Sequence, residues 1–110
     1  AKATRLVTAS NDGTASVWDI STGECVVTVR HEKELNTAAF DPFGASIVTA
    51  SQDQTAKVWD ATTGDELATF RHASSVYTAV FDPSGAFVLT ASDDKTASLW
   101  DVAGGSALVT

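Results

Sequence analysis

The stretch VTASQDQTAKVWD, residues 48–60, decides the fold of this 110-residue chain because it occurs three times in related forms. Its counterparts stand 41 residues away on either side, as VTASNDGTASVWD at 7–19 and LTASDDKTASLWD at 89–101. The register continues outside these stretches, since FDP at 40–42 matches FDP at 81–83 and His31 matches His72. A fixed period of this length indicates stacked structural repeats that bury their faces against one another.

Within one period, short segments rich in β-branched and aromatic residues alternate with turn residues. In the middle repeat these segments are LNTAAF (35–40), SIVTAS (46–51), TAKVWD (55–60) and ELATFR (66–71). Turn sequences such as DPFG at 41–44 separate them, where proline and glycine favour a chain reversal. No window has sustained helical periodicity, so the sequence predicts an all-β protein of repeated four-stranded antiparallel sheets.

Composition excludes several classes of protein. Seven Lys and Arg against 14 Asp and Glu give a net charge of −7, which opposes binding to nucleic acid or to an anionic membrane. The single cysteine, Cys25, excludes a disulfide-rich scaffold, and no apolar run is long enough to span a membrane. No targeting segment is visible, so we expect a cytoplasmic protein in which Cys25 is a buried, inert thiol.

The three Trp-Asp stretches, with a histidine well upstream of two of them, resemble the WD-repeat β-propeller family. The resemblance covers essentially the whole chain, although arginine precedes each histidine where the family usually has glycine. It implies blades of four antiparallel strands, lettered a to d outward from a central channel, and a structural tetrad of His, Thr or Ser, Asp and Trp. Carried over by position, the tetrads are His31, Thr49, Asp53 and Trp59, then His72, Thr90, Asp94 and Trp100, with Thr8, Asp12 and Trp18 in the first repeat.

The chemistry of such a tetrad suits a structural role. A buried Trp N–H needs an acceptor, which a hydroxyl or a histidine nitrogen can supply. An Asp carboxylate can accept from the histidine and from backbone N–H groups of its turn, which offsets the cost of its desolvation. Because the set recurs in every repeat, we interpret it as holding each blade together rather than as a catalytic site.

The repeat register divides the chain into a partial blade at 1–30 and full blades at 31–71 and 72–110. The first repeat has counterparts of strands b, c and d but none of LNTAAF, the innermost strand. Propeller rings contain about four to eight blades, so we expect an incomplete ring within one chain, with an apolar face open at each end. The residues expected on these faces are Val7, Val17 and Val27 at one end and Val88, Leu99 and Leu108 at the other.

Other chemistry is not indicated by the sequence. The two histidines are repeat equivalents rather than a metal-binding cluster, and the pair Asp93-Asp94 lacks the alternating acids and closing Glu of an EF-hand. Neither a Gly-rich phosphate loop nor a nucleophile elbow is present. We therefore expect no enzyme, no cofactor, no metal and no catalytic residue.

We expect a non-catalytic propeller module that assembles into a closed ring and serves as a protein-interaction scaffold. Its expected partners are copies of itself, as a cyclic homo-oligomer of two or three chains, or another propeller chain, together with peptides or proteins. The charged loop Glu32-Lys33-Glu34 is the candidate partner contact, and a merely solvated loop is the alternative. An alternative function is an engineered or excised propeller fragment that self-assembles without a biological partner.

Overall fold

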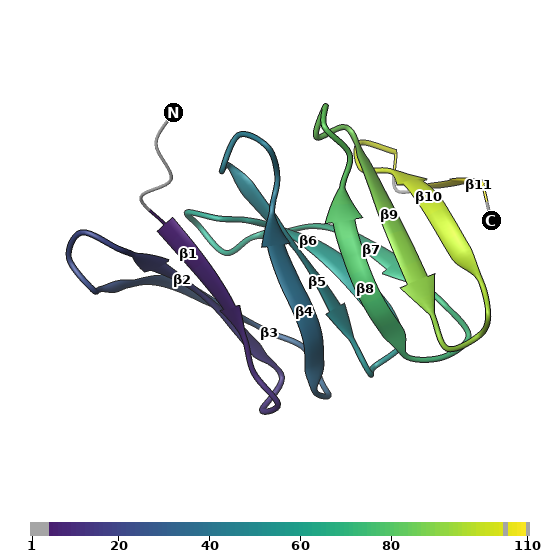
Figure 1. The fold of residues 1–110 in the computed structure, drawn as a ribbon, viewed down its shortest axis with the longest axis horizontal. Coiled ribbons are helices and arrows are strands. Elements are labelled where there is room, and N and C mark those ends of the chain that lie inside the picture. Colours follow the sequence, from purple (N-terminus) through teal and green to yellow (C-terminus); the bar gives the residue numbers. More distant parts are fainter. Residues whose placement is uncertain (1–4, 105, 110) are drawn as a thin grey trace.

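A computed structural model describes residues 5–104 and 106–109, which form β-strands joined by turns (Figure 1). In chain order the strands are β1 (Arg5–Ala9), β2 (Thr14–Asp19), β3 (Cys25–Arg30), β4 (Leu35–Phe40), β5 (Ser46–Ser51), β6 (Thr55–Asp60), β7 (Glu66–Arg71), β8 (Val76–Phe81), β9 (Phe87–Ser92), β10 (Ala97–Asp101) and β11 (Ser106–Val109). No helix that could cross a membrane occurs among the residues described. The predicted all-β fold class is confirmed.

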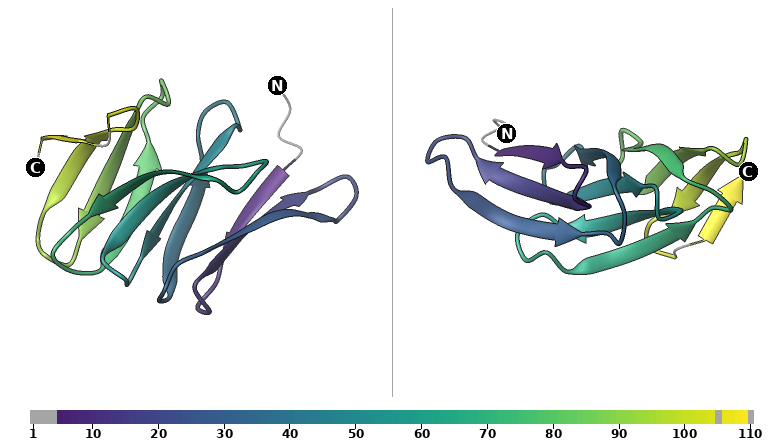
Figure 2. Two further views of the ribbon diagram at one scale, coloured as in Figure 1. Left: turned by 180° about the vertical axis from the view of Figure 1, so that it is seen from behind. Right: turned by 90° about the horizontal axis from the view of Figure 1, so that it is seen from below.

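The strands form three antiparallel sheets in which each strand pairs with its neighbours in sequence. The first sheet contains β1–β3, the middle sheet β4–β7 and the third sheet β8–β11. The sheets lie side by side like the blades of a fan, with β1 next to β4 and β4 next to β8 (Figure 1). The molecule is flat, measuring 40 × 30 × 18 Å along its principal axes (Figure 2). None of the sheets closes on itself, as expected for incomplete propeller blades.

Two apolar cores fill the joints between the sheets. At the first joint, Val17 of β2 lies in one core with Ile47 and Trp59 of the middle sheet. At the second joint, Val58 of β6 shares a core with residues of β8 and β9, and Phe70 stacks on Trp100 with ring centroids 4.9 Å apart. Each sheet therefore buries a face only where another sheet covers it.

The structure shows that several residues expected on the open faces are inside instead. Val17 and Val88 are fully buried, and Val7 and Val27 pack against the core that contains Val17. Side chains alternate between the two faces of a strand, and the row Val7, Val17, Val27 points toward the middle sheet. The prediction that Val7, Val17 and Val27 form the open face at this end is therefore wrong.

The outward face of the first sheet instead presents Leu6, Trp18 and Ile20, which are 53%, 37% and 59% exposed. At the other end Leu108 is exposed and Leu99 partly so, as expected, and Val80 of β8 and Leu89 of β9 are exposed as well. The expectation of a buried thiol is also wrong, because Cys25 on the outer strand β3 is exposed.

Gly13, in the β1–β2 turn, combines a positive φ with a tight space, and its repeat equivalents Gln54 and Lys95 adopt the same conformation, with φ of 77° and 70°. Its φ is +88°, and a Cβ there would lie 2.8 Å from the carbonyl oxygen of His31 and 2.9 Å from that of Lys33. By contrast, Gly44 has φ +75° but nothing within 4 Å of such a Cβ. The β1–β2 turn thus touches the link that leads to the middle sheet.

We predict that Gly13→Ala lowers the free energy of unfolding by at least about 2 kcal/mol, because it adds a backbone clash to the strain of a positive φ. Gly44→Ala, the matched control, adds only the strain and should cost about 1 kcal/mol. Urea denaturation followed by tryptophan fluorescence measures both values. Equal losses in the two variants would contradict the close packing described for Gly13.

Candidate functional site

His31 joins the first sheet to the middle sheet. It follows β3, and its backbone N–H donates to the carbonyl of Gly13 in the β1–β2 turn over 2.7 Å. Its side chain reaches the next sheet, with Nδ1 2.7 Å from Asp53 Oδ2 and Nε2 2.6 Å from Thr49 Oγ1. One sheet therefore holds the backbone of this residue and the neighbouring sheet holds its imidazole.

The hydrogen bonds around His31 determine its tautomer. The ionised Asp53 carboxylate can only accept, so His31 Nδ1 is the donor and Nε2 accepts from the hydroxyl of Thr49, which itself accepts from Trp59 Nε1–H over 2.9 Å. Nδ1 then carries the imidazole proton and donates to Asp53, whose other oxygen accepts from the Thr55 N–H over 2.9 Å. The chain of hydrogen bonds therefore runs from Trp59 through the Thr49 hydroxyl and a neutral His31 to the Asp53 carboxylate.

The directions in which folding shifts the pKa values of His31 and Asp53 agree with this arrangement. Burial lowers the pKa of His31 below its ordinary 6.5, although the hydrogen bond and charge of Asp53 act to raise it. For Asp53, burial raises the pKa, but hydrogen bonds from Thr55 and His31 outweigh it and leave the pKa below 3.8. The contact between them is therefore a hydrogen bond from a neutral imidazole to a carboxylate.

The same arrangement recurs between the middle and third sheets. His72 follows β7, and its Nε2 lies 2.7 Å from Thr90 Oγ1 while its Nδ1 lies 3.1 Å from Asp94 Oδ2. Trp100 Nε1–H donates to Thr90 over 2.8 Å, and the backbone N–H of His72 donates to Gln54 in the β5–β6 turn over 2.9 Å. The structure thus brings together both sets of four residues that the resemblance to WD repeats implies.

The residues carried over to the first repeat are also close together, but they face solvent. Trp18 Nε1–H donates to Thr8 Oγ1 over 3.1 Å, and Thr14 N–H donates to Asp12 Oδ1 over 3.0 Å. Thr8 and Asp12 are exposed, whereas the equivalent Thr49 is fully buried. This set has the same Trp–Thr and Thr–Asp hydrogen bonds as the other two sets, but it lies on an open surface.

The loop Glu32-Lys33-Glu34 lies in the link between β3 and β4, with all three residues exposed. Its backbone is fixed, because the buried Ser51 hydroxyl lies 3.3 Å from the Lys33 carbonyl and 2.9 Å from that of Glu34. The Glu34 carboxylate accepts from Gln52 Nε2 over 3.2 Å. The loop therefore presents charged side chains from a rigid backbone.

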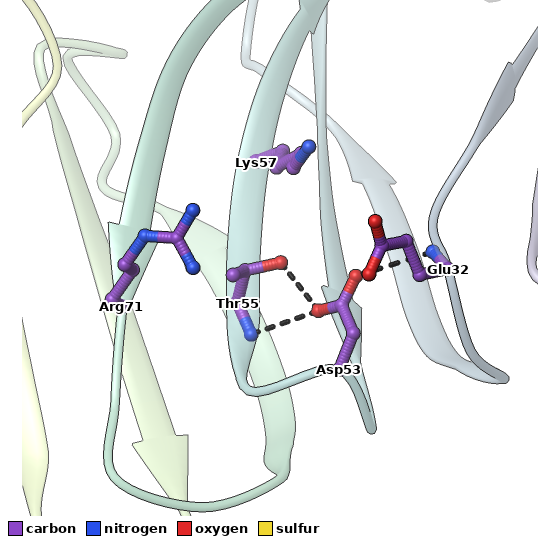
Figure 3. A pocket seen from close by; sticks show the side chains of 5 residues that line it. All are labelled: Glu32, Asp53, Thr55, Lys57 and Arg71. Atoms are coloured by element: carbon purple, nitrogen blue, oxygen red, sulfur yellow. Dashed lines mark hydrogen bonds between the residues drawn. The ribbon is translucent and has the colours of Figure 1, made fainter.

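A charged pocket on the middle sheet was missed by the sequence reasoning. It encloses about 100 Å³ and is lined by Glu32, Asp53, Thr55, Lys57 and Arg71 (Figure 3). Lys57 Nζ forms an ion pair with Glu66 over 3.1 Å. A detectable signal existed, because Lys57 stands where the other repeats have Ser16 and Ser98. The pocket is small beside ligand sites of about 300–1,000 Å³, so at most a side chain or small ion would fit.

The sequence profile of the WD domain, G-beta repeat (WD40), matches residues 2–19, 23–60 and 64–101. The chain belongs to the WD40 family. The three successive matches confirm the resemblance read from the Trp-Asp stretches. A comparison with curated proteins finds no significant match. WD40 domains are generally non-catalytic modules for protein–protein interaction.

We predict that Thr49→Val destabilises the WD40 chain by about 2 kcal/mol or more, because it leaves the Trp59 N–H and the His31 Nε2 buried without partners. Thr8→Val is the matched control at the equivalent exposed position, where water replaces the lost bond and the cost should stay below about 1 kcal/mol. Urea denaturation gives both values. A Thr49→Val variant as stable as Thr8→Val would show that the buried bonds contribute little.

We also predict that stability falls on acidification in two steps. Because the folded pKa of His31 is lowered, its contribution is present above pH 6.5 and is lost as the pH falls below that value. The lowered pKa of Asp53 adds a second loss below about pH 3.8. Urea midpoints at pH 7.5 and 5.5 test the first step, which His31→Gln should diminish. A higher midpoint at pH 5.5 would contradict the assigned neutral histidine.

Proposed function

We propose that this chain is a non-catalytic protein-interaction module whose open sheet faces associate with further blades to complete a propeller ring. The observation that carries the proposal is that the apolar residues exposed on the outward face of the first sheet have repeat equivalents buried at the first joint. Leu6, Trp18 and Ile20 correspond to Ile47, Trp59 and Ala61, which are 0%, 7% and 0% exposed. The residue types at these positions thus suit a covered surface.

The other end of the molecule offers the complementary face. Val80, Leu89 and Leu99 lie opposite one another across β8, β9 and β10 and form one row. The equivalent row in the first sheet is the one that packs against the middle sheet at the first joint. Repeating that joint between chains places the third sheet of one copy on the first sheet of the next.

This head-to-tail contact is heterologous, so it closes a ring only where the rotation between chains fits a whole turn. With blade counts of about four to eight, two or three chains are the expected number, and another propeller chain is the alternative partner. Fully burying a leucine or isoleucine side chain contributes about 1.5–3 kcal/mol, so several such residues together support association. A fragment that assembles without a biological partner would use the same interface.

The charged loop Glu32-Lys33-Glu34 supplies a second contact surface in this proposal. It stands at the edge of the first joint, and the equivalent link of the next repeat is the uncharged Ala73-Ser-Ser75. Its charge gives the middle sheet a surface that the third sheet does not share. A location in the cytoplasm is consistent with the single cysteine of the chain.

We predict that native mass spectrometry finds a discrete oligomer of two or three chains and that Leu89→Lys converts it to monomer, because the lysine places a charge on the apolar row. Leu67→Lys is the matched control, since Leu67 is similarly exposed, at 53% against 49%, but lies on the outer strand β7. A stable wild-type monomer at micromolar concentration, or equal disruption by both variants, would contradict the proposal.

A further inference from the structure

We propose that the charged pocket on the middle sheet binds a carboxamide side chain, supplied by a glutamine or asparagine of a partner protein. The pocket encloses about 100 Å³, with Arg71 on one side and Glu32 on the other (Figure 3). The inference rests on the proposed interaction function and deepens it by naming the chemistry of one partner contact. It is carried by two opposite charges that line one small pocket and have no partner among the described residues.

The charges around the pocket distinguish the middle sheet from the other two. Three of them, counting the ion-pair partner of Lys57, stand where the aligned repeats have small uncharged residues. Glu32 aligns with Ala73, Lys57 with Ser16 and Ser98, and Glu66 with Cys25 and Ala107. The joint between the middle and third sheets forms without such charges, so they are not needed to hold two sheets together.

Pairing of β6 and β7 brings the cationic side chains of the pocket to one face of the sheet. Arg71 lies opposite Thr55 and Thr69 opposite Lys57, and paired residues of antiparallel strands point to the same face. Thr55 and Lys57 are two residues apart in β6, so they also share that face. Glu32 comes from the link before β4 and closes the pocket on its other side (Figure 3).

Lys57 is held in place but keeps donors for a ligand. Its Nζ lies 3.1 Å from Glu66 Oε1 and 5.5 Å from the centroid of the Trp59 ring. The other oxygen of Glu66 accepts from Thr69 Oγ1 over 2.5 Å, which fixes the carboxylate. An ammonium group has three N–H donors, so the ion pair leaves two of them for a ligand.

Arg71 and Glu32 supply the unused bonding groups of the pocket. In the part of the chain that the structure describes, no hydrogen bond or ion pair reaches the Arg71 guanidinium or the Glu32 carboxylate. Asp53, by contrast, accepts from Thr55 on one oxygen and from His31 on the other. The pocket therefore offers donors on one side and a carboxylate acceptor on the opposite side.

This arrangement discriminates between ligands by their charge. A carboxylate would be attracted by Arg71 and Lys57 but repelled by Glu32, and an ammonium group would meet the reverse. A zwitterion would lose the hydration of two charges on entering. A carboxamide has no net charge, and it combines a carbonyl oxygen that accepts with an NH₂ group that donates. Its oxygen can face the two cations while its NH₂ group faces Glu32.

The size and place of the pocket favour a side chain of a protein as the source of the carboxamide. Ligand sites for whole small molecules enclose about 300–1,000 Å³, whereas this pocket has room for the end of one side chain. Glutamine and asparagine are the residues that carry a primary carboxamide. The pocket includes Glu32, the first residue of the charged loop proposed above as a contact surface, so a partner on that loop lies beside it.

The test is an NMR titration of the full ¹⁵N-labelled chain with the capped peptides GSQSG and GSNSG. We expect weak, saturable binding in the millimolar range that shifts the backbone amide signals of Thr55 and Arg71. The acid counterparts GSESG and GSDSG should bind at least about fivefold more weakly, because they lose the donor to Glu32 and add a like charge beside it. The peptide GSASG, which keeps every backbone amide, should be equally weak.

Glu32→Gln should reverse the preference between amide and acid peptides. Without the Glu32 carboxylate, Arg71 and Lys57 favour an anion, so GSESG should bind better than GSQSG. Glu24→Gln makes the same change of charge at an exposed position before β3 and is the matched control. This control should keep the preference of the wild type for GSQSG.

Arg71→Met should weaken binding of GSQSG by at least about threefold, because the guanidinium donors are lost while most of the side-chain bulk is kept. Arg30→Met is the matched control, since Arg30 has the same place in the first repeat but Ser16 stands there in place of the lysine. It should bind GSQSG like the wild type. Unchanged indole signals of Trp59 and Trp100 show that each variant is folded.

The inference is overturned if the amide peptides bind no better than their acid counterparts or than GSASG. It is also overturned if Glu32→Gln leaves the preference unchanged, if Arg71→Met and Arg30→Met bind alike, or if millimolar peptide shifts no signal of the pocket. Shifts confined to the Trp18 indole would place the peptide on the open face of the first sheet and would likewise overturn it.

The titration is separable from the ring-assembly test. The Leu89→Lys variant changes the third sheet and allows the same measurement on a chain that does not self-associate. A preference for the amide peptides in a wild-type chain that stays monomeric would support the pocket and overturn head-to-tail assembly. Self-association without any preference among the peptides would do the reverse.

Discussion

The structure depends on one constraint, which is that a four-stranded sheet with two apolar faces is stable in water only between neighbours. Each joint in this chain satisfies the constraint twice, through an apolar core and through a histidine that crosses from one sheet to the next. The core supplies most of the free energy because it is non-directional and large. The histidine supplies the register, because its two nitrogens fit a single arrangement of threonine and aspartate.

Much of this arrangement follows from the sequence alone. The 41-residue period and the turn residues predict the sheets, and the resemblance to WD repeats implies the sets of residues that meet around His31 and His72. Period and register are one-dimensional properties, so repeated letters reveal them directly. Which row of side chains an end sheet exposes depends instead on how the sheets pack in three dimensions. Val17 and Trp18 are adjacent and both apolar, and only the packing shows that Val17 is buried and Trp18 exposed.

The charged pocket was missed for a related reason. Lys57 and Arg71, which line the pocket, are distant enough in sequence that no local motif connects them, and each one alone resembles an ordinary surface charge. Antiparallel pairing of β6 and β7 brings them to one face of the sheet. Comparing the repeats position by position would have pointed to Lys57, since both equivalent positions hold serine. A position at which one repeat differs from the others can therefore point to a site that the shared pattern does not reveal.

The way His31 and His72 are held has a consequence for how the molecule opens. The backbone of each histidine is hydrogen-bonded to one sheet and its imidazole to the next sheet. Unfolding of either sheet therefore breaks hydrogen bonds to the neighbouring sheet. Local fluctuations at a joint are thereby coupled along the chain, in the manner of a one-dimensional cooperative system. The middle sheet is covered by a neighbouring sheet on both sides, so its amide hydrogens should exchange with solvent most slowly.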